Sequence, residues 1–141
     1  MYRIFFSILF AVTFCCAKDL NAVSEKIDID LARMSGTMVY AQVYKMVTEP
    51  KKFIGKHIKM KGFFSSYFDE ETEQRFYGCV IQDALACCSQ GLAFELSKPR
   101  KYPKEYPAEG SVITITGDFD FVKEEDGASY PIIRNAKLLN E

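Results

Sequence analysis

Hydrophobic and polar residues alternate along five stretches of the chain, and this period of two predicts five β-strands. In the first stretch, Ile58, Met60 and Phe64 share one face, while lysines occupy the other. Turn residues or a proline-rich segment separate the stretches from one another. The expected strands span residues 56–67, 75–83, 91–96, 111–123 and 129–138.

A helical period precedes the strands. Between residues 37 and 48, Val39, Val43, Met46 and Val47 recur at the spacing of one helix face. Pro50 marks the end of this expected helix, because proline cannot continue the backbone hydrogen-bond ladder. The sequence therefore predicts one N-terminal helix followed by a mainly β domain.

The number and order of the strands favour a small closed barrel. Three strands follow one another closely, a long segment with three prolines (residues 97–110) comes next, and a hairpin completes the domain. This is the order of the five-stranded OB-like barrel, with the proline-rich segment in place of the helix that is usual at that point. Gly62 and Gly117 fall inside strands, where a closed barrel needs sharp bends. A β-sandwich is the alternative architecture.

The first residues are the most apolar part of the chain. An apolar run from Ile4 to Phe14 is shorter than the ~20 residues that span a bilayer as a helix. Its length is typical of the apolar part of a secretory signal. We therefore expect residues 1–17 to be a signal, residues 18–36 to be a tether and residues 37–141 to be the OB-like domain.

Two adjacent cysteines follow the apolar run and leave two modes of export open. Cys16 or Cys15 can be the acylated residue of a bacterial lipoprotein, which would anchor the mature chain to a membrane. Cleavage after Ala17 would instead release a periplasmic or secreted protein. Either mode places the protein in the cell envelope or outside the cell.

Net charge adds one expectation about partners. The chain carries 18 basic and 19 acidic residues, which gives a formal charge of −1. A charge so close to neutrality offers no net attraction to a polyanion. Together with export, it predicts that nucleic acid is not a partner, and that a metal ion or an envelope protein is.

Candidate chemistry concentrates in the turn between the second and third expected strands. Asp83, Cys87 and Cys88 follow one another closely there, and carboxylates and thiolates are zinc ligands. Cys79 lies one strand away, and His57, the only histidine, can complete the shell if the first strand runs beside this turn. These residues predict a zinc site, or a copper(I) site that would use the same soft sulfurs.

The cysteines also allow two other roles. Cys79, Cys87 and Cys88 remain when the signal is removed, so at least one of them stays unpaired within the chain. A disulfide from Cys79 to one of the others, or buried thiols, would make the cysteines structural and inert. A thiol-redox role needs a thiol pKa that nearby positive charge lowers, and Lys98–Lys101 can supply such charge.

Several short motifs resemble a family of small bacterial envelope proteins of unknown function. The most distinctive is Asp83-Ala84-x-x-Cys87-Cys88-x-x-Gly91, and the others are Pro50-x-x-Phe53-Ile54-Gly55-Lys56, Ile58-x-Met60-x-Gly62 and Glu109-Gly110. A similar domain occurs in the periplasmic subunit of a predicted two-gene bacterial permease. The resemblance covers residues 37–138 and implies an OB-like fold in the cell envelope, with no established catalytic activity.

Familiar catalytic signatures are missing from the sequence. It contains no Gly-rich phosphate loop, no nucleophile elbow and no His-Glu zinc-protease motif. We therefore expect a non-enzymatic, envelope-anchored binding domain that handles a metal ion or a protein partner through the Cys87–Cys88 turn. The alternatives are a structural or adaptor module with inert cysteines and a thiol-redox protein.

Overall fold

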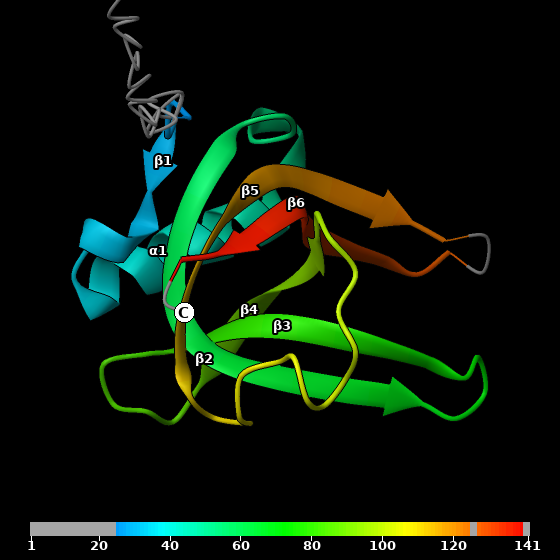
Figure 1. The fold of residues 1–141 in the computed structure, drawn as a ribbon. Coiled ribbons are helices and arrows are strands. Elements are labelled where there is room, and N and C mark those ends of the chain that lie inside the picture. Colours follow the sequence, from blue (N-terminus) through cyan, green and yellow to red (C-terminus); the bar gives the residue numbers. More distant parts are fainter. Residues whose placement is uncertain (1–24, 125–126, 140–141) are drawn as a thin grey trace, which may run out of the picture.

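A computed structural model describes residues 25–124 and 127–139. Its strands form one six-stranded sheet, and pairing of β2 with β5 closes this sheet into a barrel (Figure 1). The elements in chain order are β1 (Ile29–Asp30), η1 (Leu31–Arg33), α1 (Gly36–Thr48), η2 (Pro50–Lys52), β2 (His57–Asp69), β3 (Gln74–Gln82), β4 (Ser89–Leu96), β5 (Val112–Lys123) and β6 (Ser129–Leu138).

The strand connectivity is that of the OB fold. Apart from the short β1, the ring runs β2-β3-β4-β6-β5 and returns to β2. All neighbours in this ring are antiparallel except β4 and β6, which are parallel. The predicted fold class is confirmed, and each predicted strand matches its observed bounds to within two residues. The two-residue β1 was not predicted.

Two glycines allow the barrel to close. A Cβ added at Gly62 would lie 2.5 Å from the carbonyl oxygen of Val80, and one added at Gly117 would lie 2.6 Å from that of Arg134. Gly62 directly precedes Phe63, the residue at which β2 pairs with both β5 and β3. The register between β5 and β6 shifts around Gly117. Both predicted bends are confirmed, and each is a close backbone approach that only glycine permits.

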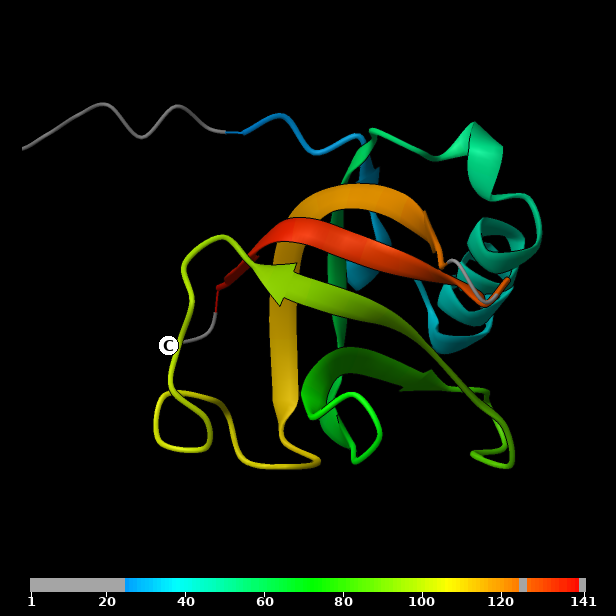
Figure 2. The same ribbon diagram turned by 90° about the vertical axis from the view of Figure 1, so that its right-hand side faces the viewer.

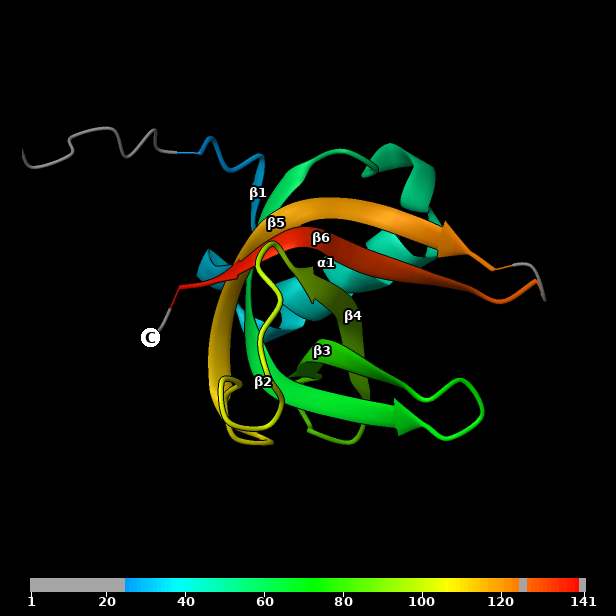
Figure 3. The same ribbon diagram turned by 45° about the vertical axis from the view of Figure 1, so that its right-hand side comes forward.

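The helix and the long loop occupy different sides of the barrel. α1 packs against β3, β4 and β6 through three of the four residues predicted for its inner face, Val39, Val43 and Met46. The fourth, Val47, is 37% exposed. Residues 97–110 form a loop, as the prolines predicted, and the Tyr102–Pro103 bond is cis. Figure 2 shows α1 and η2 on one side and this loop on the other. The β2–β3 and β5–β6 hairpins project together from the barrel (Figure 3).

The ordered fold begins before residue 37, the boundary expected from the sequence. β1 pairs in parallel with the start of β2, and Leu31 is 2 % exposed in the core. The Asp28 carboxylate also accepts a hydrogen bond from the backbone N–H of His57 at 2.9 Å. The second part of the expected tether is therefore integral to the barrel. The expected signal, residues 1–17 with Cys15 and Cys16, lies outside the described residues.

Within the part of the chain that the structure describes, no helix is both long enough and apolar enough to cross a membrane.

Candidate metal centre

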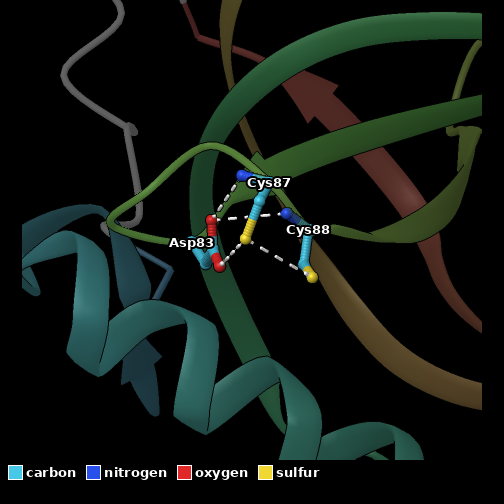
Figure 4. A group of neighbouring side chains, drawn as sticks. All are labelled: Asp83, Cys87 and Cys88. Atoms are coloured by element: carbon cyan, nitrogen blue, oxygen red, sulfur yellow. Dashed lines mark hydrogen bonds between the residues drawn. The ribbon is translucent and has the colours of Figure 1, made fainter.

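The turn between β3 and β4 folds around the carboxylate of Asp83. Its Oδ1 accepts hydrogen bonds from the backbone N–H groups of Cys87 and Cys88, at 3.0 and 3.4 Å. The backbone N–H of Asp83 donates to the carbonyl of Cys88 at 2.9 Å. Aspartate favours such turns because its short side chain can bond to nearby backbone groups. These bonds hold both cysteines beside one carboxylate (Figure 4).

Three potential ligand atoms converge in this turn. The Cys87 Sγ lies 3.1 Å from Asp83 Oδ2 and 3.8 Å from the Cys88 Sγ, and all three atoms lie within 4.8 Å of one another. Around a tetrahedral zinc ion, two thiolates lie ~3.8 Å apart, and a thiolate and a carboxylate oxygen lie ~3.5 Å apart. The turn therefore needs only small side-chain adjustments to hold such an ion.

Hydrogen bonding also sets the protonation of the turn. The hydrogen bond that the Cys87 thiol donates to Asp83 raises the pKa of that thiol, and the neighbouring Cys88 thiol raises it further. The same hydrogen bond lowers the pKa of the Asp83 carboxyl, as do the bonds from the backbone. A redox thiol needs a lowered pKa. The pKa of Cys87 is raised instead, so this thiol does not fit a redox role.

Cys79 lies outside this cluster. Its side chain is fully buried in the barrel core, where desolvation raises the pKa of the thiol to about 12. It shares its strand face with the buried Ile81 and pairs in register with Leu92 on β4. The inclusion of Cys79 in the metal shell was therefore wrong, because alternation on β3 turns this side chain into the core.

His57 lies outside the cluster as well. Its Nδ1 is 2.8 Å from Asp118 Oδ1, because the two residues are register partners on β2 and β5. Its Nε2 faces Glu25 Oε2 at 3.5 Å, and Glu25 also pairs with Lys137. Among the described residues, one group of three or more potential metal ligands comes together, and it consists of Asp83, Cys87 and Cys88. The expected contribution of His57 to the shell was thus wrong.

Sequence reasoning missed the polar cluster around His57. Asp118 is held there by His57 and by the Asn135 side chain, which donates to its Oδ2 at 3.3 Å. The signal for this pairing is the register between the first and fourth strands of the barrel, since it places residue 57 opposite residue 118. That register follows from barrel closure and is not visible in local spacing.

No family model and no curated protein matches this chain. Among solved structures, the chain is similar to the crystal structure of the mitochondrial single-stranded DNA-binding protein Rim1 from S. cerevisiae. The TM-score is 0.33 and the sequence identity 16%, over 60% of this chain and 95% of that one. The strand connectivity defines the class of the protein: it is an OB-fold domain with an N-terminal helix.

This match corrects one expectation about partners. The sequence predicts that nucleic acid is not a partner, but the matched OB-fold protein is a single-stranded DNA-binding protein. The exclusion was therefore wrong as a general statement. It rested on a net charge near zero and on export, and net charge does not report how charged residues are distributed over one face of a barrel.

Proposed function

We propose that this protein is a non-enzymatic, envelope-anchored OB-fold domain that binds a zinc ion through Asp83, Cys87 and Cys88. The observation that carries the proposal is the convergence of two sulfurs and one carboxylate oxygen in a single turn. Three protein ligands leave one tetrahedral position for water or for a group from a partner. An open position on an exposed turn suits an ion that is taken up and passed on.

The ligand set favours zinc over copper(I). Copper(I) prefers soft ligands such as thiolates and thioethers, whereas zinc accepts thiolates and carboxylates in one shell. Asp83 is the residue that organises the turn, and its Oδ2 lies 3.1 Å from the Cys87 sulfur. Any ion that both sulfurs bind therefore lies next to a hard oxygen ligand, which zinc uses and copper(I) does not.

Accessibility separates this proposal from the alternative of inert cysteines. Cys87 and Cys88 are exposed, so an ion can reach both sulfurs without opening the barrel. A structural thiol is normally buried and packed, as Cys79 is. The two kinds of cysteine environment in one domain support a binding role for the turn and a packing role for Cys79.

A competition titration of the full chain under reducing conditions, against a chromophoric zinc chelator, tests this proposal. We expect one zinc ion per chain and a loss of affinity of at least about a hundredfold in Cys87→Ser and in Cys88→Ser, since each removes a direct ligand. Asp83→Asn should weaken binding by at least about tenfold, because it removes the charged oxygen and loosens the turn.

Two matched controls complete the experiment. Cys79→Ser and His57→Gln alter residues of the same types that lie outside the cluster, so both should keep the wild-type zinc affinity in folded protein. Absence of bound zinc in the wild type, or an affinity that Cys87→Ser leaves unchanged, would contradict the proposal. The lipid anchor stays a separate prediction, which the mass of the processed N-terminal peptide tests through an acyl group on Cys16 or Cys15.

A further inference from the structure

Helix α1 is apolar on two faces. Its inner face packs on the barrel, but Met38 and Tyr44 on the outer face are 60% and 56% exposed. Lys45 is the single charged residue of the helix. A helix on the surface of a soluble domain normally carries charged and polar residues on its outer side. The composition of α1 therefore points to a second surface that covers it.

A groove follows this outer face. Its volume is about 700 Å³, and its walls include Met34, Met38 and Tyr44. Lys45 and Glu49 line the end of the groove that lies at the C-terminus of the helix. The groove is thus apolar along the helix and charged at one end, a pattern that suits a surface with both apolar and charged layers.

Lysines gather around the charged end. From Lys45 to Lys56 the chain holds four exposed lysines and one glutamate, Glu49, which pairs with Lys52. Exposed apolar side chains lie in the same segment: Val47 is 37% and Ile54 is 50% exposed. Figure 2 shows η2 beside α1 on one side of the barrel. Exposed apolar side chains next to lysines are typical of surfaces that bind anionic membranes.

We propose that the face formed by α1 and η2 rests on the surface of a bilayer that contains anionic lipids. The excess of lysines complements the negative headgroups, while Met38 and Tyr44 reach the boundary between headgroups and acyl chains. Tyrosine suits this depth, because its ring is apolar and its hydroxyl stays hydrated.

The N-terminal part of the sequence supports this choice of partner. An apolar run at residues 4–14 precedes the fold and is the expected signal. If Cys16 carries a lipid, the eight residues before Glu25 can span at most ~28 Å, so the domain stays beside the bilayer. This inference does not depend on zinc binding, because the cluster of Asp83, Cys87 and Cys88 shares no residue with the proposed face.

Methionine oxidation of the full chain tests the proposal. The chain is reconstituted with vesicles of phosphatidylcholine alone, or of phosphatidylcholine and phosphatidylglycerol in equal parts, and treated with hydrogen peroxide. We expect Met38 to oxidise at least about fivefold more slowly on the anionic vesicles, since oxidation follows exposure. Met46 and Met60 are fully buried and serve as internal standards in the same peptide map.

Charge-reversal variants test whether the lysines are the cause of this protection of Met38. Lys45→Glu combined with Lys51→Glu should restore fast oxidation of Met38 on anionic vesicles. Lys101→Glu combined with Lys104→Glu is the matched control, because these exposed lysines lie on the loop of residues 97–110, and it should keep the protection.

Three results would overturn the proposal. The first is equal oxidation of Met38 on both kinds of vesicle, whether fast or slow, because the lysines would then contribute nothing. The second is loss of protection in the loop variant as well as in the helix variant. The third is protection that rises with protein concentration in the absence of vesicles, which would mean that a second copy of the chain covers the face.

Discussion

The turn of Asp83, Cys87 and Cys88 and the wall of the barrel use the same residue types in different ways. In the turn, the hydrogen bonds of these side chains join residues at most five positions apart, and both thiols are exposed. In the wall, strands bury Cys79, and His57 meets Asp118 across 61 positions.

This difference explains why one region is a candidate site and the other is not. A tight turn can gather several polar side chains at the surface, since its backbone is satisfied locally and its side chains stay accessible. A barrel wall directs alternate side chains inward and pairs the others with neighbouring strands. Changes in the wall should therefore cost stability and spare zinc binding, while changes of the three ligand residues in the turn should do the reverse.

The largest expected contrast is in thiol reactivity. Cys87 and Cys88 should alkylate readily in the native protein, whereas Cys79 should react at least about a thousandfold more slowly, because it must wait for the barrel to open. Timed alkylation with iodoacetamide, followed by peptide mass spectrometry, measures both rates. Zinc should protect the two turn thiols and leave Cys79 unaffected. Alkylation of Cys79 in the native protein at the same rate as Cys87 would contradict the predicted difference in thiol reactivity.

Zinc affinity should depend steeply on pH. Both thiols must lose their protons to bind zinc, and the pKa of Cys87 is raised by its hydrogen bond to Asp83. Below that pKa the proton competes with the ion, so affinity should fall as pH falls, by up to about a hundredfold per pH unit for two thiols. Titrations from mildly alkaline to mildly acidic pH measure this slope. An affinity that does not change over this range would exclude coordination by thiolates.

Much of the fold follows from the sequence because its signals are local. Alternation of apolar residues predicts the five long strands, and the mid-strand glycines predict the bends. The approach of Asp83 to the cysteines is also local, since six consecutive residues contain the whole cluster. Cys79 could have been assigned to the core on the same grounds, because it shares a strand face with Ile81.

Other features could not be predicted, because they depend on the closed barrel. β1 has only two residues, which is too short for any period to show. The pairing of His57 with Asp118 follows from the register between β2 and β5, and that register exists only once the barrel closes. The docking of Glu25 and Asp28 against the same region likewise needs the start of β2 in place.

Gly62→Ala should be a costly change in the wall. The new methyl group would lie 2.5 Å from the Val80 carbonyl oxygen and 2.8 Å from the Cys79 sulfur. Overpacking of this kind lowers the free energy of unfolding by about 1–3 kcal/mol, which urea denaturation measures. Gly36→Ala is the matched control, because its Cβ meets nothing within 4 Å. Zinc affinity should stay unchanged in both variants, and a loss in Gly62→Ala alone would couple the wall to the turn.

Asp118→Asn should have a smaller effect that depends on pH. The hydrogen bond from His57 lowers the pKa of Asp118, so the stabilisation by the carboxylate exists above the reference pKa of 3.8 and is lost as pH falls further. The Asp118 side chain is 45% exposed, so solvent screening limits the loss at neutral pH to about 0.5–1 kcal/mol. Thermal unfolding should show wild type and variant converging in acid. A difference that grows in acid would contradict this sign.

Ala86→Gly should have the smallest effect and the opposite sign. Ala86 has a φ of 54°, in the left-handed region that glycine adopts without strain. Relief of that strain should raise the free energy of unfolding by about 0.5–1 kcal/mol, which urea denaturation can resolve. Ala84→Gly in the same turn is the control, and it should not stabilise, since Ala84 has no positive φ. Zinc affinity should stay unchanged in Ala86→Gly, because the hydrogen bonds from Cys87 and Cys88 to Asp83 hold the sulfurs whichever residue stands at position 86. A fall in zinc affinity without a fall in stability would show that the strained backbone, and not the Asp83 carboxylate alone, sets the spacing of the two thiols.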